Sequence, residues 1–70
     1  MEIENEVVEK GVWYNIEEEA RTYYFARGSI HTVLNTRALK VSERGTHYVR
    51  DMNDILHIIN HTWIAIEVAE

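Results

Sequence analysis

The sequence predicts a small all-β domain built as an antiparallel meander of six or seven short strands. Several segments alternate β-branched or aromatic residues with polar ones at a period of two. The chain contains no proline, so no segment is prevented from pairing on both sides. Gly11, Gly28 and Gly45 recur at intervals of 17 residues, each directly after a Lys or Arg. Glycine supplies the positive φ that a tight turn needs, so these positions predict turns between strands.

The elements follow one another with short connections. The expected strands are Val12–Ile16, Thr22–Ala26, Ser29–Leu34, Ala38–Ser42, Thr46–Arg50, Ile55–Ile59 and Thr62–Val68. Glu17–Ala20 is expected to be a charged loop. In the last strand, Ile64, Ile66 and Val68 share one face, while Trp63, Ala65 and Glu67 share the other.

Residues 53–60 admit a second interpretation. Asn53 or Asp51 can cap a short helix there, which would make the fold α+β. Three isoleucines within five positions favour a strand instead, because β-branched side chains suit a pleated surface.

A meander of this size must curl to bury one face and protect its edges, so we expect an open barrel or a strongly twisted sheet. The side chains expected in its core are apolar or aromatic and lie within the predicted strands. They are Val12, Tyr14, Ile16, Tyr23, Phe25, Ile30, Leu34, Leu39, Val41, Val49, Ile55, Ile59, Ile64, Ile66 and Val68.

The length of the chain predicts a single domain spanning residues 1–70, with residues 1–6 frayed. So short a chain buries a small share of its surface, and a homodimer would add to its stability. The absence of cysteine rules out thiol chemistry and fits a reducing compartment. The acidic amino terminus does not match a signal peptide, and no apolar run is long enough to span a bilayer, so we expect a cytoplasmic protein.

Charge is sorted along the chain. Residues 1–20 contain Glu2, Glu4, Glu6, Glu9, Glu17, Glu18 and Glu19 against the single base Lys10. Residues 21–50 contain Arg21, Arg27, Arg37, Lys40, Arg44 and Arg50 against Glu43 alone. The last 20 residues carry four acids and no Lys or Arg. The formal net charge of −5 therefore conceals two acidic ends around a basic middle block.

The residues do not form a recognisable catalytic motif. His57 and His61 are four residues apart, a spacing that would place both on one face of a helix, but two ligands do not complete a metal site. We therefore predict a non-enzymatic protein without cofactor or metal. A metal-assisted hydrolase built on these two histidines is the least favoured alternative.

The basic middle block supports one binding hypothesis. Its Arg and Lys residues are interleaved with Tyr23, Tyr24, Phe25 and Tyr48, and small β-barrels bind single strands by stacking bases on aromatic rings beside a cationic groove. The net negative charge opposes this function, because phosphate contacts supply most nonspecific affinity.

The acidic ends support the converse hypothesis. A face of carboxylates spaced like phosphates would attract the cationic surface of a DNA-binding protein. The acidic stretches MEIENEVVE and IEEEA, together with the size and the lack of cysteine, resemble the small acidic host-takeover proteins of large Bacillus phages. That group includes DNA mimics that inhibit the nucleoid protein HU.

The resemblance implies a non-enzymatic protein that occupies the nucleic-acid-binding surface of a basic host protein. This is the function that we predict, with nucleic-acid binding through the middle block as the alternative. The acidic face is expected to comprise Glu4, Glu6, Glu9, Glu17, Glu18, Glu19, Asp51, Asp54 and Glu67.

Overall fold

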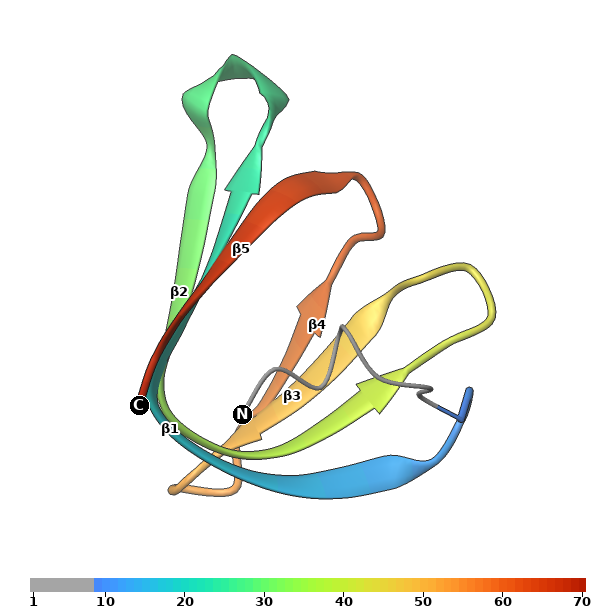
Figure 1. The fold of residues 1–70 in the computed structure, drawn as a ribbon, viewed down its shortest axis with the longest axis vertical. Coiled ribbons are helices and arrows are strands. Elements are labelled where there is room, and N and C mark those ends of the chain that lie inside the picture. The colour runs from blue at the N-terminus through green and yellow to red at the C-terminus, as the bar shows by residue number, and fades with distance from the viewer. Residues whose placement is uncertain (1–8) are drawn as a thin grey trace.

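A computed structural model describes residues 9–70, and in this part of the chain five strands form one antiparallel sheet (Figure 1). The strands are β1 (Trp13–Phe25), β2 (Ile30–Val41), β3 (His47–Asp51), β4 (Leu56–Ile59) and β5 (Trp63–Ala69). They lie in the order β4-β3-β2-β1-β5. The predicted all-β antiparallel architecture is confirmed, whereas the predicted fraying of residues 1–6 falls outside the described residues.

The structure has five strands in the described residues because two pairs of predicted strands are continuous. β1 joins the first two expected strands through the segment 17–20, so the expected charged loop there is wrong. β2 likewise joins the next two. Neither stretch contains glycine or proline to end it. The pairing register of β1 with β2 shifts between Asn15 and Glu18, and that of β2 with β3 shifts between Thr36 and Ala38. Such shifts are typical of β-bulges, which let a long strand continue past a local change of pairing.

The segment 53–60 is a turn followed by a strand, and the alternative helix is wrong. The Asp51 carboxylate accepts hydrogen bonds from the backbone nitrogens of Asn53 (2.9 Å) and Ile55 (3.1 Å), which closes the turn before β4. Within residues 9–70 the helical geometry is limited to a 3-10 turn at Ala26–Gly28. Gly28 adopts a φ of 82° there, as a turn glycine is expected to do.

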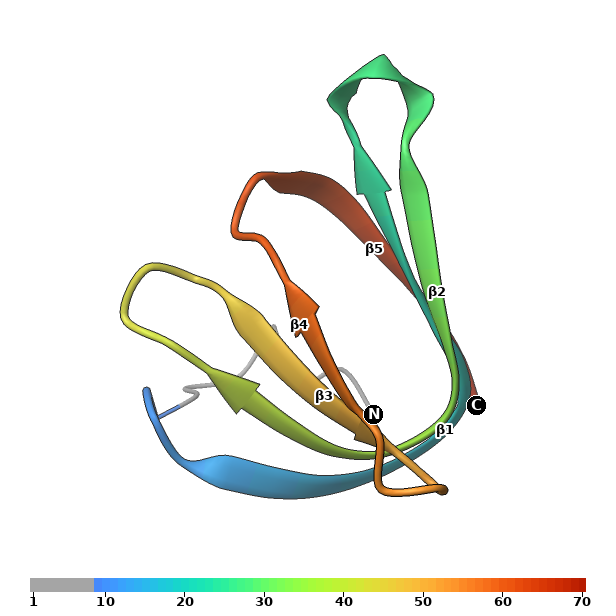
Figure 2. The ribbon, with the colours of Figure 1, turned by 180° about the vertical axis from the view of Figure 1, so that it is seen from behind.

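The sheet bends but is neither closed nor strongly curled, so the expected open barrel or strongly twisted sheet is not confirmed. β4 and β5 are its two edges, and the order of the described strands places no hydrogen-bonded pairing between them. In a flat sheet these edges would be roughly 19 Å apart, at about 4.8 Å per strand. The three residues 60–62 connect them and can span only about 14 Å. β1 and β2 accordingly bend, and the ends of β4 and β5 approach each other (Figures 1 and 2).

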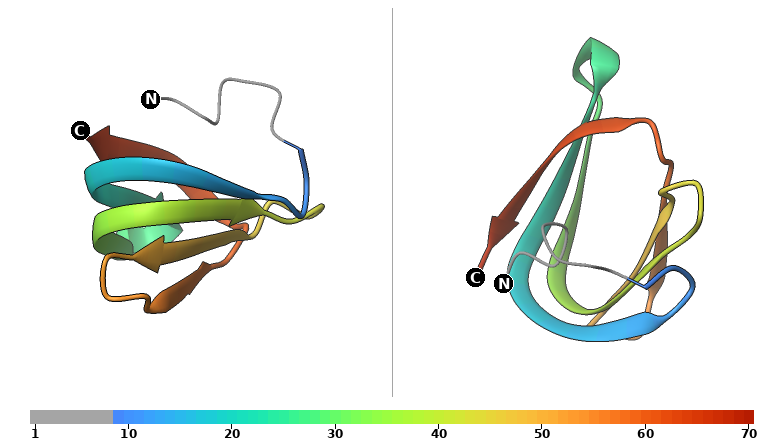
Figure 3. Two further views of the ribbon diagram at one scale, coloured as in Figure 1. Left: turned by 90° about the horizontal axis from the view of Figure 1, so that it is seen from below. Right: turned by 45° about the vertical axis from the view of Figure 1, so that its right-hand side comes forward.

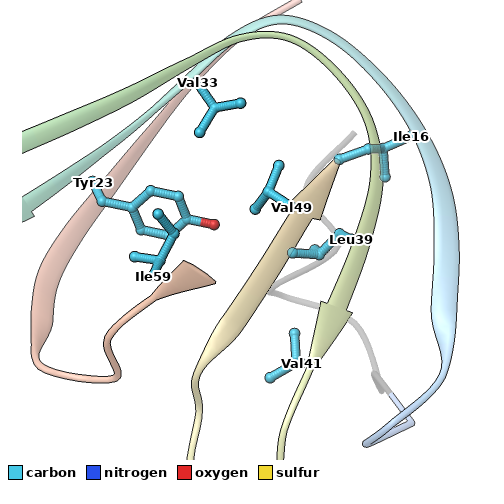
Figure 4. Packing of buried hydrophobic residues seen from close by; sticks show 7 residues of the cluster. All are labelled: Ile16, Tyr23, Val33, Leu39, Val41, Val49 and Ile59. Carbon is cyan, nitrogen blue, oxygen red and sulfur yellow. The ribbon is translucent and has the colours of Figure 1, made fainter. Parts of the chain in front are cut away.

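The core lies on the inner face of this bend (Figure 4). Its buried apolar residues are Ile16, Tyr23, Val33, Leu39, Val41, Val49 and Ile59. Six of them were predicted from the sequence, and Val33 was not. Ile30 and Leu34 are 60% and 63% exposed, so their expected burial is wrong. In β2 the side chain of Val33 points inward. Ile30 and Leu34 are an odd number of residues away from it, so their side chains point to the outer face.

Three further residues expected in the core are exposed, namely Val12, Ile55 and Ile64. Val12 and Ile55 precede strands and do not alternate with them. In β5 a register shift opposite Tyr24 and Phe25 lets both Trp63 and Ile66 pack against the core, although they were assigned to opposite faces. Residues 9–70 include no helix with the length and apolar character needed to cross a bilayer.

Candidate binding surfaces

A chain of buried polar side chains crosses the inner face. The Arg21 guanidinium donates to both carboxylate oxygens of Glu18, at 2.9 Å from Nε and 2.8 Å from Nη2. Thr36 donates its hydroxyl to Glu18 Oε1 at 2.6 Å. Arg21 Nη1 also reaches the Tyr23 hydroxyl at 3.4 Å, and that oxygen lies 2.7 Å from His47 Nδ1. Five side chains from three strands are therefore joined in one network.

Trp63 completes this network at the edge of the sheet. Its ring packs edge-on against His47, with centroids 5.4 Å apart, and against Tyr23 at 6.5 Å. Its indole nitrogen donates to the backbone oxygen of Gly45 at 3.4 Å. Because Trp63 begins β5 and Gly45 lies in the turn before β3, this contact connects two distant parts of the sheet. The network is a structural element, since a substrate has no access to its buried polar atoms.

The outer face of β1, β2 and β3 carries a different cluster. Trp13 pairs in register with Lys40, and Lys40 pairs with Tyr48. The Lys40 ammonium lies 5.1 Å from the centroid of the Trp13 ring and 4.9 Å from that of Tyr48. The Arg50 guanidinium lies 5.5 Å from the Trp13 ring. These four residues form the basic–aromatic patch, in which cation–π contacts hold two cations and two rings together.

The patch continues onto β4 as an apolar surface. Tyr48 pairs with Ile58 and Arg50 pairs with Leu56, and both of these β4 side chains are exposed. Figure 3 shows the strands of this half of the sheet running side by side. One row of side chains, Trp13–Lys40–Tyr48–Ile58, therefore crosses four neighbouring strands.

The structure brings only part of the predicted basic block to this patch. Lys40, Tyr48 and Arg50 belong to it, whereas Tyr23 is buried in the core. Trp13 was not predicted as a binding residue. Its place at the start of an alternating segment indicated a strand, and only the register of β1 with β2 places its ring beside Lys40.

The residues of the predicted acidic face are dispersed. Glu17 and Glu19 are exposed on β1, but Glu18 between them is buried in its ion pair with Arg21. Glu18 is therefore absent from the surface, because strand alternation turns the middle one of three consecutive side chains inward. Glu67 is exposed on β5 and accepts a 2.7 Å hydrogen bond from the Tyr24 hydroxyl. This bond, followed by desolvation and the charge of Glu67, raises the pKa of Tyr24.

The remaining acids of that prediction lie elsewhere. The Asp51 carboxylate accepts a backbone hydrogen bond within the turn before β4. Asp54 in the same turn is exposed, and its Oδ1 lies 3.5 Å from Arg50 Nη1. Glu9 is exposed near the start of the described chain. Glu4 and Glu6 lie outside the described residues. Glu70 joins Glu17 in lining a surface hollow, so two carboxylates of the described residues gather there.

The histidines are arranged differently from the expected pairing. His57 is on β4 and His61 lies in the following turn, so they do not share a helical face. His57 Nδ1 instead lies 3.4 Å from His31 Nε2 of β2, and its Nε2 lies 3.0 Å from Asp51 Oδ2. No group of three metal-ligating side chains gathers within residues 9–70.

Comparisons with protein-family models, with curated proteins and with solved structures gave no match to this chain.

Proposed function

We propose that this protein is a non-enzymatic module that binds single-stranded nucleic acid across the basic–aromatic patch. The observation that carries this proposal is the row in which Lys40 lies between the rings of Trp13 and Tyr48. Proteins that bind single strands combine cations for the phosphates with aromatic rings on which the bases stack. The patch offers both on the outer face of the sheet, where Trp13 is exposed and the other three side chains are half-buried.

The spacing of the patch suits a single strand that runs perpendicular to the β-strands. Trp13 and Tyr48 are two strands apart, which corresponds to roughly 10 Å. Stacked nucleotides advance by about 3.4 Å each, so bases about three positions apart would meet the two rings. Lys40 and Arg50 would then lie beside the intervening phosphates. The cation–π contacts already fix the side chains of the patch before the nucleic acid binds. Binding therefore costs little side-chain conformational entropy.

The net negative charge opposes this function less at the patch than over the whole chain. The patch itself contains two cations, Lys40 and Arg50, and no carboxylate. Near the patch, Asp54 lies beside Arg50. Lys40 and Arg50 therefore give the patch a positive charge of its own, which Asp54 offsets in part.

The test is fluorescence anisotropy with labelled single-stranded DNA and RNA 12-mers at low salt. Trp13→Ala should weaken binding by about 1–3 kcal/mol, the value of one base–aromatic stack. Lys40→Gln should weaken binding and reduce the salt slope by about 0.7, as expected for one lost phosphate contact. Arg27→Gln removes an equal charge from the exposed β1–β2 turn and is the matched control. Absence of binding, or equal losses in Lys40→Gln and Arg27→Gln, would refute the proposal.

A second candidate is the DNA-mimic function, and the exposure of Glu17, Glu19 and Glu67 along β1 and β5 favours it. The partner would be a basic DNA-binding protein of the host cytoplasm. The protein alone would then bind neither single- nor double-stranded DNA, but would release duplex DNA from HU, the partner that the resemblance to phage DNA mimics implies. The double variant Glu17→Lys/Glu19→Lys should abolish that release, whereas Glu43→Lys in the β2–β3 turn should not. Unchanged release by the double variant would exclude these residues.

A further inference from the structure

His31 and His57 form a contact across the inner face that neither binding surface uses. His31 lies on β2 and His57 on β4, with β3 between these strands in the sheet. Their ring centroids are 5.6 Å apart at an interplanar angle of 75°. The two nearest nitrogens, His31 Nε2 and His57 Nδ1, are 3.4 Å apart. His31 is exposed and His57 is half-buried, so solvent ions reach this point.

Asp51 fixes the orientation of the His57 ring. Its Oδ2 atom lies 3.0 Å from His57 Nε2, while its Oδ1 atom accepts the two backbone hydrogen bonds of the turn. The carboxylate is thus an acceptor, and His57 places its proton on Nε2. The lone pair of His57 is consequently on Nδ1, which faces His31.

This arrangement has the form of a histidine metal ligand with its supporting carboxylate. A histidine that binds a metal usually donates its other ring N–H to a carboxylate, which sets the tautomer and the ring orientation. Two nitrogens bound tetrahedrally to Zn²⁺ at about 2.0–2.1 Å are about 3.4 Å apart, which matches the separation of the two imidazole nitrogens. The exposed His31 supplies the second lone pair in its Nδ1–H tautomer, which forms when Nε2 loses its proton to solvent and Nδ1 takes one up.

We propose that His31 Nε2 and His57 Nδ1 bind a divalent transition-metal ion such as Zn²⁺, with Asp51 as the positioning residue for His57. Imidazole ligands suit Zn²⁺, Cu²⁺ and Ni²⁺ rather than Mg²⁺ or Ca²⁺. Since no third His, Asp or Glu of residues 9–70 joins the pair in a three-ligand cluster, water completes the coordination. The bound ion connects β2 to β4 across the inner face.

Isothermal titration calorimetry of the full chain with ZnCl₂ tests the proposal. We expect one Zn²⁺ per chain. His31→Ala and His57→Ala should each abolish this binding, whereas His61→Ala removes an exposed histidine from the next turn and should leave it unchanged. Asp51→Asn should raise the Kd by about 10–100-fold, the usual effect of losing a supporting carboxylate. A cooperative thermal unfolding transition, measured for each variant without metal, shows that the variant is folded.

A second measurement identifies the coordinating atoms without relying on variants. Long-range ¹H–¹⁵N spectra of the imidazole rings should show Zn²⁺ shifting His57 Nδ1 and His31 Nε2 while His57 Nε2 stays protonated. Absence of saturable binding up to about 1 mM free Zn²⁺ would overturn the proposal. So would binding through His57 Nε2, or binding that persists in His31→Ala and disappears in His61→Ala.

Discussion

Glu18 and Arg21 form an ion pair that is closed to solvent, with side chains 2% and 0% exposed and Oε2 2.8 Å from Nη2. Glu18 lies at the register shift of β1 against β2, and the hydroxyls of Thr36 and Tyr23 provide further hydrogen-bonding partners for the pair. Among the described residues no buried side-chain polar atom lacks a hydrogen-bond partner. The charges are therefore tolerated in the core because their hydrogen-bonding capacity is used there.

Removing one member of this pair should destabilise the fold strongly. Glu18→Gln leaves the Arg21 charge buried beside a neutral amide, and breaking such a pair costs about 3–5 kcal/mol. Urea unfolding followed by circular dichroism measures the loss. Glu17→Gln makes the same chemical change at an exposed neighbour and should stay within about 0.5 kcal/mol of wild type. Equal effects of both variants would mean that Glu18 is not buried.

The Tyr23 hydroxyl is predicted to stabilise the core by linking Arg21 to His47. Tyr23→Phe keeps the ring but leaves its buried polar neighbours with one partner fewer, which should cost about 1–3 kcal/mol. Tyr48→Phe makes the same change on the outer face and should have an effect within about 0.5 kcal/mol. Denaturant midpoints of the two variants provide the comparison, and a neutral Tyr23→Phe would show that the hydroxyl adds nothing to stability.

Two isoleucines on the two edge strands should differ sharply in their contribution to stability. Ile59 is 2% exposed on β4, and Ile64 is 67% exposed on β5. Ile59→Ala should cost about 2–5 kcal/mol through lost burial and the remaining cavity. Ile64→Ala should change the free energy of unfolding by no more than about 0.5 kcal/mol. The reverse order would show that β5 presents its other face to the core.

Tyr24 should titrate above the ordinary tyrosine range because its hydroxyl donates to the Glu67 carboxylate. Its folded pKa is raised, so this hydrogen bond contributes below the unfolded pKa and is lost as pH rises through the folded pKa. Absorbance at the tyrosinate band measures the titration. Glu67→Gln should lower the pKa of Tyr24, and Glu43→Gln serves as the control. An identical titration curve for Glu67→Gln and wild type would exclude the effect.

The sequence alone determined the all-β class and the turns at Gly11, Gly28 and Gly45. The absence of proline, the alternating segments and the glycines following Lys or Arg were sufficient, because strand propensity and positive φ are local properties. Most of the buried apolar residues were predicted for the same reason. Of the proposed patch, the sequence indicated Lys40, Tyr48 and Arg50 as members of one basic–aromatic block.

Only the tertiary structure decided which face each side chain occupies. Bulges near Glu18, Thr36 and Phe25 shift the alternation, and a shift of one residue exchanges the two faces of a strand. Burial of Glu18, exposure of Leu34 and the contact of His31 with His57 all depend on pairing between residues distant in the chain. Sequence periodicity is local, whereas strand register is set by the partner strands, so these features could not be predicted from the sequence.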